Sequence, residues 1–401
     1  MADVRPFRVV RPRDTDAEAV IAPPYDVLSE AQARSIARER RSFVRITRSE
    51  VDLPEGTDPH SEAAYAKARE TLDAFLADGL LEQDDAPSYL FYGQIMGDHE
   101  QVGIIAACSV DEYDDGRIAK HEFTRPDKED DRTHHMEVLD AQVGLVFLAY
   151  RPTDALARIT AEVTASAPRW RVTTDDGVVH TVWSPTPAQV EAVQAAFADV
   201  DKLYVADGHH RSAAASRVHA HRKSALTSHF IAGLYPSDRL QVMAYNRVVH
   251  DLNGHTPDAF LAAVGEAFTV SPANDGVPAE RGEVRMYIGG TWRSLRVRDG
   301  RVDLDDPVAR LDASVLQQHL LGPLLGIDDP RRSTRITFVG GIHGPDALVE
   351  AVDAGAAVAF HLYPTGLDQL FEVADAGEVM PPKSTWFEPK LRGGVVVHRL
   401  D

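Results

Sequence analysis

Short apolar runs separated by polar turns alternate with amphipathic segments along this chain, a pattern that predicts a mixture of strands and helices. Residues 61–81 place apolar side chains such as Ala64 and Leu72 at helical spacing, and Asp78-Gly79 predicts the end of this helix. Ser29 is expected to cap an earlier helix, and residues 187–200 predict a later one. The apolar runs predict strands over residues 7–10, 88–92, 103–110, 144–150, 170–173, 178–182, 229–235 and 242–249.

Residues 256–401 show the same alternation. Helices are expected over 257–267, 312–325 and 345–353, and strands over 284–288, 335–339 and 356–363. We therefore expect an α+β protein in which residues 1–245 form an amino-terminal domain with a mixed sheet and residues 246–401 form a smaller α/β domain. Residues 375–401 are expected to form a terminal, lid-like segment of that second domain.

Composition and charge exclude several classes of protein. The 401 residues include 62 acidic and 42 basic side chains, a formal net charge of -20, whereas a protein that binds nucleic acid needs clustered Lys and Arg. No apolar run approaches the roughly 18 residues of a membrane span, and no signal or lipidation sequence opens the chain, so we expect a cytoplasmic protein without a membrane partner. The one cysteine, Cys108, lies in an apolar run and is expected to be a buried structural thiol, which excludes a zinc ribbon or a disulfide framework.

The stretch from residue 203 to 217 carries the clearest chemical signal. An apolar strand leads into Asp207-Gly208-His209-His210-Arg211 and then into an alanine-rich helix. The first amide N–H groups of a helix lack intrahelical partners and the helix dipole is positive there, so this turn can hold an anion such as phosphate. Gly208 lets the backbone approach the anion, Arg211 can bind two oxygens at once, and the two histidines titrate near neutrality. The alternative is a structural turn in which Asp207 only caps the helix.

Residues 118–135 are too polar for a protein core and form a second candidate region. Glu122 suits a general base, and Arg132 suits a phosphate clamp. The histidine that a zinc protease would need four residues after His121 is absent, which excludes that motif. The alternative for this region is an exposed acidic loop that leads into a helix starting at Asp130.

The segment from Met380 to Lys390 holds several prolines and two aromatic residues, so it is stiff and irregular. We predict that it packs against the amino-terminal domain with Lys383 facing the pocket formed by Gly208 to Arg211. A chain cut after Glu378 is then expected to keep a folded amino-terminal domain. The alternative is a structural lid anchored by its aromatic residues. The polar residues expected to contact phosphate or carboxylate groups are Lys383, Ser384, Thr385 and Lys390.

Four short motifs together resemble the hallmarks of the DUF1015 proteins of bacteria and archaea. The motifs are Ala22-Pro-Pro-Tyr-Asp26, His121-Glu-Phe-Thr124, Asp207-Gly-His-His-Arg211 and Pro381-Pro-Lys-Ser-Thr-Trp-Phe-Glu-Pro-Lys390. They occur in the order that the family shows, and the resemblance covers essentially the whole chain. Membership of this family implies no settled activity.

The Asp-Gly-His-His-Arg turn also resembles, more distantly, the phosphate-binding turn of the ParB/sulfiredoxin-like fold. That fold includes nucleotide-hydrolysing partition proteins and kinases that phosphorylate free L-serine. The resemblance implies a nucleotide, ATP or ADP, whose phosphates lie at the start of the helix. The residues that it implies as phosphate ligands are Gly208, His209, His210 and Arg211.

The same resemblance suggests roles for other residues. Asp207 would orient the histidines or bind Mg²⁺, and His209 would take part in catalysis. The general base would be Asp26 by analogy with the serine kinases, whereas local chemistry favours Glu122, and we keep both candidates. The residues expected near the substrate are Tyr25, His121 and Thr124.

Ordinary nucleotide-binding loops are absent from the sequence, which has no Walker A pattern and no Gly-x-Gly-x-x-Gly after a strand. Phosphoryl transfer needs mainly positioning and charge neutralisation, and these motifs offer both. The leading hypothesis is a nucleotide-dependent phosphotransferase that acts on a small hydroxyl metabolite such as free serine. One alternative is a non-catalytic nucleotide-binding switch. The other is a metal-dependent phosphatase or hydrolase of a phospho-metabolite, with ligands drawn from His121, Glu122, Asp207, His209 and His210.

Overall fold

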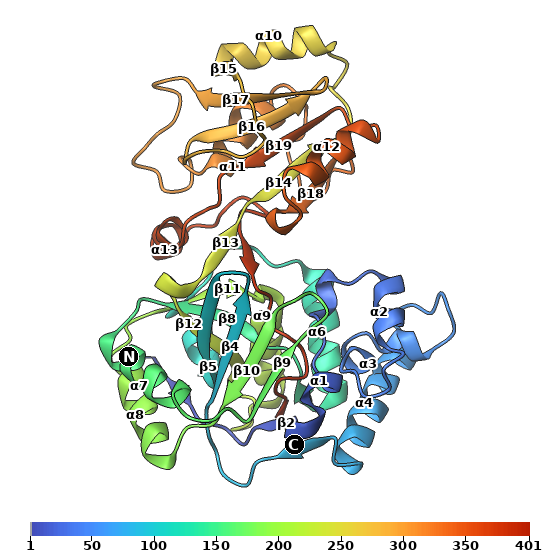
Figure 1. The fold of residues 1–401 in the computed structure, drawn as a ribbon, viewed down its shortest axis with the longest axis vertical. Coiled ribbons are helices and arrows are strands. Elements are labelled where there is room, and N and C mark those ends of the chain that lie inside the picture. Colours follow the sequence, from blue (N-terminus) through green and yellow to red (C-terminus); the bar gives the residue numbers. More distant parts are fainter. Residues whose placement is uncertain (1) are drawn as a thin grey trace. The chain divides into compact units, whose positions relative to one another are not determined.

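A computed structural model describes residues 2–401 and divides the chain into two compact units (Figure 1). Unit 1 contains the residues up to Lys120, Thr124–Leu240 and Pro389–Asp401. Unit 2 contains His121–Phe123 and Gln241–Glu388. No helix formed by residues 2–401 is long and apolar enough to cross a membrane.

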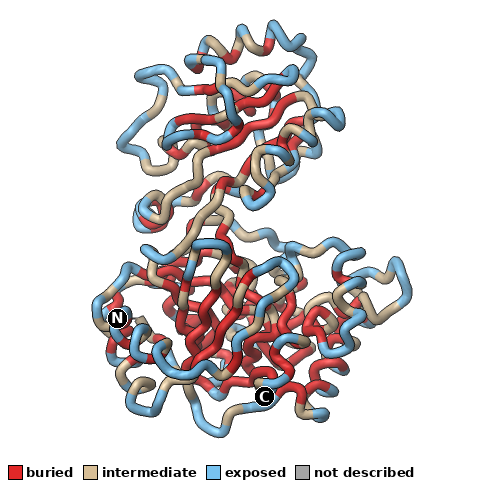
Figure 2. The backbone as a smooth tube through the Cα atoms, viewed as in Figure 1, coloured by how far each residue is buried: buried red, intermediate tan, exposed pale blue. Residues whose placement is uncertain are grey.

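Unit 1 is built on a nine-stranded sheet, whose strands form its most continuous buried part (Figure 2). Most neighbouring strands are antiparallel, but β6 pairs with β11 and β8 with β12 in parallel, so the predicted mixed sheet is confirmed. Cys108 is fully buried in β5, as expected. The strands in sheet order are β6 (Ile118–Ala119), β11 (Leu203–Asp207), β8 (Val146–Tyr150), β12 (His229–Pro236), β5 (His99–Ser109), β4 (Leu90–Met96), β10 (Val179–Trp183) and β9 (Trp170–Thr173), with β1 (Val4–Arg5) on β5.

The helices of unit 1 follow the predicted amphipathic segments. The helix expected over 61–81 is α4 (Glu62–Ala77), which buries its apolar stripe and has the Ser61 hydroxyl as its N-cap. Ser29 caps α2 (Glu30–Ile36) in a capping box, as expected. The helix α6 begins at Pro126 rather than at Asp130, because proline suits the first turn of a helix. The other helices are α1 (Ala17–Val20), α3 (Val44–Thr47), α5 (Val110–Asp114), α6 (Pro126–Leu139), α7 (Asp154–Thr164), α8 (Pro187–Phe197) and α9 (His209–Arg222).

The strand expected over residues 7–10 is wrong in its bounds. Residues on either side form strands instead, β1 (Val4–Arg5) on β5 and β2 (Val10–Pro12) on β3 (Leu81–Gln83). Phe7 makes only an isolated bridge with Ser88. The chain turns from one sheet to another here, which an apolar run does not reveal.

The terminal segment Pro389–Asp401 belongs to the core of unit 1. Val397 exchanges backbone hydrogen bonds with Val10 at 2.7 and 3.1 Å, and β21 (His398–Arg399) pairs with β7 (Ala141–Gln142). The side chain of Arg392 is buried and forms an ion pair with Asp176. A cut after Glu378 would remove this segment of unit 1, and that such a chain keeps a folded amino-terminal domain stays a prediction.

Unit 2 contains a six-stranded sheet in which every pairing is antiparallel. The alternation of helices and strands predicted an α/β domain, and this is wrong in the strict sense, because hairpins such as β16–β17 connect neighbours directly. The helix expected over 312–325 is α11 (Asp312–Leu316) followed by a π-helical turn over Gln317–Leu321. The strands in sheet order are β15 (Phe268–Pro272), β17 (Thr291–Val297), β16 (Glu283–Ile288), β19 (Val358–Leu362), β14 (Tyr245–Val249) and β18 (Ile336–Gly340).

Three further helices and a separate two-stranded ribbon complete the unit. The helices are α10 (Pro257–Ala267), α12 (Asp346–Asp353) and α13 (Leu367–Asp375). The ribbon joins β13 (Gln241–Met243) to β20 (Trp386–Glu388), the segments at which the chain leaves and re-enters unit 1. The strand expected over 242–249 is therefore divided between β13 and β14.

Gly394→Ala is expected to destabilise unit 1 more than the matched variant Gly116→Ala. Both glycines have positive φ, +81° and +86°, where a Cβ costs about 1–2 kcal/mol. A Cβ at Gly394 would also lie 2.8 Å from Cβ of Phe43, whereas a Cβ at Gly116 would meet no described atom within 4 Å. Urea unfolding of both variants measures the difference, and equal losses would contradict the packing of the terminal segment against Phe43.

Candidate functional site

The predicted strand, turn and helix around Asp207 are present in unit 1. The strand β11 ends at Asp207, Gly208 has φ +96°, and α9 starts at His209. A Cβ at Gly208 would lie 3.1 Å from Nε of Arg211, so both the backbone conformation and the close packing of Arg211 favour glycine here. The helix α9 lies beside α6 (Figure 1). The first turn of α9 presents its amide groups and the positive end of its dipole next to the side chains of Asp207 and Arg211.

The carboxylate of Asp207 joins two cations. It lies 3.5 Å from Nζ of Lys390 and 3.6 Å from Nη2 of Arg211, and it accepts a hydrogen bond of 2.9 Å from the amide of Gly208. Burial alone would raise the pKa of Asp207, but the charges of Lys390 and Arg211 outweigh burial and hold it well below its usual range. Asp207 therefore stays ionised and fixes both cations beside the first turn of α9.

A pair of buried glutamines holds the backbone at Lys390. Gln94 in β4 and Gln101 in β5 are directly paired across the two strands, and each is at most 1% exposed. The side-chain amide of Gln101 donates to Oε1 of Gln94, and that of Gln94 donates to the carbonyl of Lys390, both at 2.9 Å. A buried amide needs its hydrogen bonds satisfied, so this chain of contacts fixes the terminal segment on the sheet.

Arg211 is held from several sides. Its Nη1 donates to the carbonyl of Leu145, and a Cβ at Gly144 would lie 3.2 Å from its Cδ. Burial disfavours the guanidinium charge, but Asp207 and then Asp26 keep the pKa of Arg211 above its usual value. Asp26 is itself exposed, so it faces solvent near a fixed cation.

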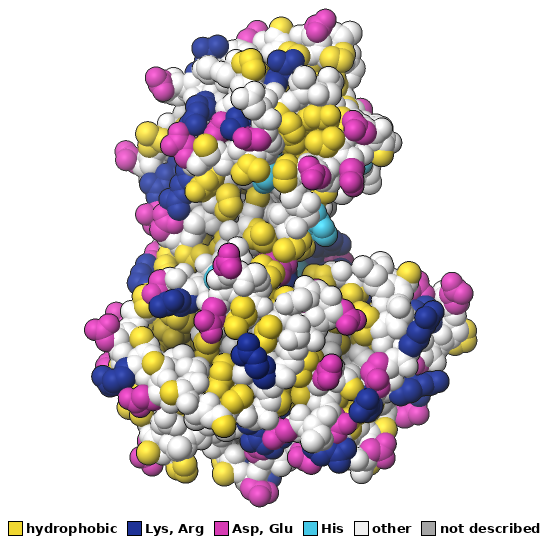
Figure 3. Space-filling view, viewed as in Figure 1, with side chains coloured by type: hydrophobic (Ala, Val, Ile, Leu, Met, Phe, Trp, Pro, Cys, Tyr) yellow, Lys and Arg dark blue, Asp and Glu magenta, His cyan; other side chains and the backbone are white. Residues whose placement is uncertain are grey.

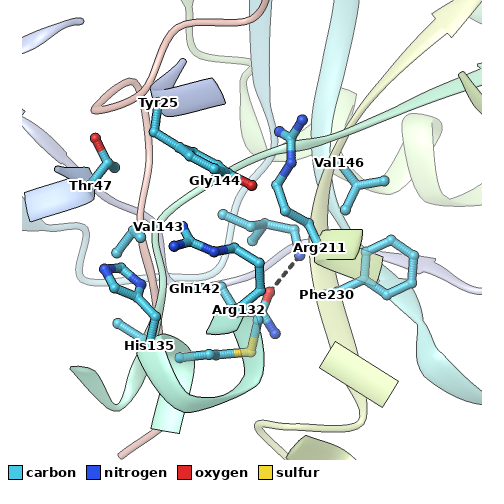
Figure 4. Close-up of a pocket in the computed structure, with 13 residues that line it drawn as sticks. Tyr25, Thr47, Arg132, His135, Gln142, Val143, Gly144, Val146, Arg211 and Phe230 are labelled. Carbon is cyan, nitrogen blue, oxygen red and sulfur yellow. Dashed lines mark hydrogen bonds between the residues drawn. The ribbon is translucent and has the colours of Figure 1, made fainter. Parts of the chain in front are cut away.

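A second cluster surrounds Tyr25. The guanidinium carbon of Arg132 lies 4.3 Å from the centre of the Tyr25 ring, a cation–π distance. Asp131 binds Arg132 at 2.5 Å, accepts a hydrogen bond of 2.7 Å from the Tyr65 hydroxyl, and lies 2.7 Å from Nδ1 of His60. Burial raises the pKa of Tyr25 although Arg132 opposes this, so the Tyr25 hydroxyl remains a proton donor at neutral pH. Its hydroxyl points toward Arg211 (Figure 4).

A small cavity lies between these two clusters. It encloses about 40 Å³, which is room for roughly three water-sized groups. Only a compact group of a ligand therefore fits inside. The walls are largely apolar, with polar groups from Tyr25, Arg132 and Arg211 (Figure 4). The remaining lining residues are Thr47, His135, Met136, Ala141, Gln142, Val143, Gly144, Val146, Phe230 and Ile231.

The candidate residues predicted from sequence divide between the two units. Unit 1 brings Tyr25, Asp26, Arg132, Asp207 and Arg211 together, as the contacts and electrostatic couplings above show. His209 is buried in the first turn of α9, and Nε2 of His210 accepts a hydrogen bond of 3.1 Å from the amide of Arg125. Thr124 donates to Glu129 at the start of α6.

Other candidates belong to unit 2. His121 accepts a backbone hydrogen bond of 2.8 Å from Met380, and Glu122 follows it in the same unit. Ser384 donates to the carbonyl of Pro381 at 2.7 Å, and Thr385 lies next to it. Nζ of Lys383 lies 5.4 Å from the centre of the Tyr245 ring. That Lys383 faces Gly208 to Arg211 stays a prediction.

The sequence did not reveal the residues that hold the charged side chains of the site in place. It expected Lys390 to contact a phosphate or a carboxylate, and the structure places it on the carboxylate of Asp207. Tyr65 and His60 gave no signal, since Tyr65 lies on the apolar face of α4. The glutamine pair was missed because Gln94 and Gln101 lie between the predicted strands 88–92 and 103–110.

The described residues do not form a metal site by themselves: among residues 2–401, no three His, Cys, Asp or Glu side chains are placed to hold a metal ion. Asp207, the expected Mg²⁺ ligand, already shares its charge with Lys390 and Arg211, so it attracts a further cation less than an unpaired carboxylate would. This part of the site is therefore suited to anions. Across the face drawn in Figure 3, acidic and basic side chains are mixed rather than gathered by sign.

Comparisons with known proteins give a family and several similar structures. A family model described as "Protein of unknown function (DUF1015)" matches residues 4–314. No curated protein matches the chain. A free serine kinase in complex with AMP is 13% identical, with 73% of this chain and 91% of that chain covered and a TM-score of 0.37. A conserved hypothetical protein from Pyrococcus furiosus is 13% identical, with 71% and 90% covered and a TM-score of 0.36.

A third similar structure is SbnI with a C-terminal truncation from Staphylococcus aureus. It is 11% identical, with 73% of this chain and 85% of that chain covered and a TM-score of 0.38. All three TM-scores lie below 0.5, so none of these structures assigns a function to this chain.

Arg211→Lys is expected to weaken the binding of ADP or inorganic phosphate by roughly 1–3 kcal/mol, because lysine keeps the charge but loses the two-pronged geometry of the guanidinium. Arg217→Lys is the matched control, since Arg217 lies on the same helix and pairs with Asp130 on the surface. Calorimetric titration of both variants measures the effect. Unchanged affinity in Arg211→Lys would remove Arg211 from the site.

Proposed function

We propose that this chain, which belongs to the DUF1015 family, is a nucleotide-dependent phosphotransferase that acts on a small hydroxyl metabolite such as free serine. The observation that carries the proposal is the meeting of two cations, Arg211 and Lys390, at the amino end of α9. A helix amino terminus flanked by fixed cations matches the charge of a nucleotide phosphate. ATP or ADP would supply the phosphoryl group.

The phosphate would lie against the amide groups of His209 and His210, with Arg211 and Lys390 on its oxygens, while Gly208, whose own amide donates to Asp207, would let the backbone approach it closely. Asp207 would hold these cations in place rather than touch the phosphate, because its carboxylate repels anions. Such preorganised charge stabilises the transferring phosphoryl group without rearrangement during the reaction. Further phosphate contacts are proposed for Arg132, Lys383, Ser384 and Thr385, as the sequence analysis expected.

Transfer requires a base that takes the proton of the attacking hydroxyl while the oxygen bonds to phosphorus and the bond to the nucleoside diphosphate or monophosphate breaks. Asp26 is the first candidate, because it is exposed and its charge acts on the half-buried Arg211. Glu122 in unit 2 is the second. The compact cavity under Tyr25 would admit one small group of the acceptor, and His209, buried beside Asp207, would contribute to phosphate stabilisation.

The transfer of labelled phosphate from ATP or ADP to serine and to a panel of small hydroxyl compounds tests the proposal. A labelled product is expected, together with a rise in melting temperature on adding nucleotide. Neither transfer nor a shift in melting temperature would contradict it. Binding without transfer would favour the non-catalytic nucleotide switch instead.

Asp26→Asn and Glu122→Gln separate the two candidate bases. Each substitution keeps the shape of the side chain and removes its basicity, so the true base should lose about 10²–10⁴-fold in turnover while ligand binding stays largely intact. Asp127→Asn is the control, since Asp127 is an exposed carboxylate paired with Arg125. Small and equal losses in the first two variants would show that neither residue takes the proton.

A further inference from the structure

Arg247 in unit 2 is a buried cation without an acidic partner. Three arginines among the described residues are classed as buried, namely Arg11, Arg247 and Arg392. Arg11 pairs with Asp84 and Arg392 with Asp176. Arg247, only 3% exposed, donates instead to two backbone carbonyls, those of Tyr245 and Pro382. No carboxylate in the described part of the chain forms an ion pair with it.

The surroundings of Arg247 leave its charge uncompensated. Its guanidinium lies 5.4 Å from the centre of the Phe338 ring, and the bond to Pro382 is long, at 3.4 Å. Burial lowers the pKa of Arg247 to about 10, so it still carries its charge at neutral pH. A buried charge is costly unless a counter-charge or strong hydrogen bonds compensate it. An anion bound at this place would supply the missing charge.

A second cation stands at the same place. Lys383 follows Pro382, and its Nζ lies 5.4 Å from the ring of Tyr245, the residue whose carbonyl binds Arg247. Lys383 is the only lysine between Gln241 and Glu388. It has a left-handed backbone, φ 59°, which is uncommon for residues other than glycine and is often kept at functional sites.

The loop that carries Lys383 is tied down on both sides. Ser384 donates to the carbonyl of Pro381 at 2.7 Å, and Thr365 donates to the carbonyl of Ser384 at 2.8 Å. Lys383 itself is exposed while Arg247 is covered. An incoming anion would therefore meet the exposed ammonium before the covered guanidinium.

We propose that Arg247 and Lys383 form an oxyanion subsite of unit 2 that binds a phosphoryl group. The subsite uses the Pro-Pro-Lys-Ser-Thr motif together with Arg247, which lies outside every motif found in the sequence. It extends the role proposed above for Lys383, and it does not require that phosphoryl transfer takes place.

Hydrogen–deuterium exchange of the full-length protein, with inorganic phosphate against chloride at matched ionic strength, gives a local readout. Phosphate is expected to slow exchange in peptides that cover residues 245–249 and 381–388. Peptides that cover residues 203–215 report on the amino end of α9, and peptides that cover residues 245–249 report on the subsite alone, so these two segments tell the two proposals apart. Protection confined to residues 203–215, or no protection, would overturn the subsite. Equal protection by acetate would replace the phosphoryl group by a carboxylate.

Two variants test the residues. Arg247→Met keeps the apolar stem of the side chain and removes the charge, so it should unfold at the same or a higher urea concentration than the wild type without phosphate, and lose the phosphate effect at residues 381–388. Lys383→Met alters an exposed side chain, keeps the fold, and should weaken phosphate binding at that segment at least tenfold. Arg332→Gln is the control, since the Arg332 side chain is 90% exposed.

A purely structural Arg247 would give a different pattern. If the guanidinium serves only to tie down Pro382, Arg247→Met destabilises the protein equally with and without phosphate. In that case Lys383→Met leaves phosphate protection of residues 381–388 unchanged, and the proposal is overturned.

Discussion

The carboxylate of Asp207, held between Lys390 and Arg211, is the interaction on which the site in unit 1 depends. It joins the end of β11, the first turn of α9 and a segment from the end of the chain. Two cations would repel one another at the start of a helix whose dipole is also positive, so neither would remain there without this acid. The glutamine pair of β4 and β5 fixes the backbone of Lys390 and so sets the geometry of the whole group.

The two units compensate the charges of their site cations in different ways. In unit 1, Asp131 compensates Arg132, and Asp207 serves both Arg211 and Lys390. These groups are positioned before any ligand arrives, which is the condition for strong binding of a charged group. In unit 2, Arg247 has only backbone carbonyls and an aromatic ring around it. The paired cations of unit 1 suit the orientation of a reacting phosphate. The uncompensated Arg247 of unit 2 suits the binding of a further anion.

Local patterns predicted the elements, while contacts between distant segments escaped them. The stripe and cap of α4, the capping box of α2 and the turn at Gly208 follow from residues within one or two turns, so the sequence was sufficient for them. The packing of residues 389–401 inside unit 1 depends on partners such as Val10 and Asp176 that lie hundreds of residues away. Strand direction in unit 2 likewise depends on which runs become neighbours, and alternation of helices and strands does not determine this.

The candidate site likewise contains residues that sequence motifs identified and residues whose role depends on contacts between distant segments. The residues of the Asp207 turn were found because a run of polar residues stands out after an apolar strand, whereas Tyr25 was named only through the family resemblance of its motif. The groups that orient them, Asp131, Tyr65 and the glutamine pair, are ordinary polar residues whose role exists only in three dimensions.

Calorimetric titration of ADP into the wild type and Lys390→Met tests the central claim most directly. The variant keeps Asp207, Arg211 and the fold but removes one of the two cations at the amino end of α9. The account predicts that ADP binds the wild type and that affinity in Lys390→Met falls at least about tenfold, the effect of losing one charge-assisted contact. Equal affinity in the two proteins, or no binding to either, would contradict a phosphate site at this turn.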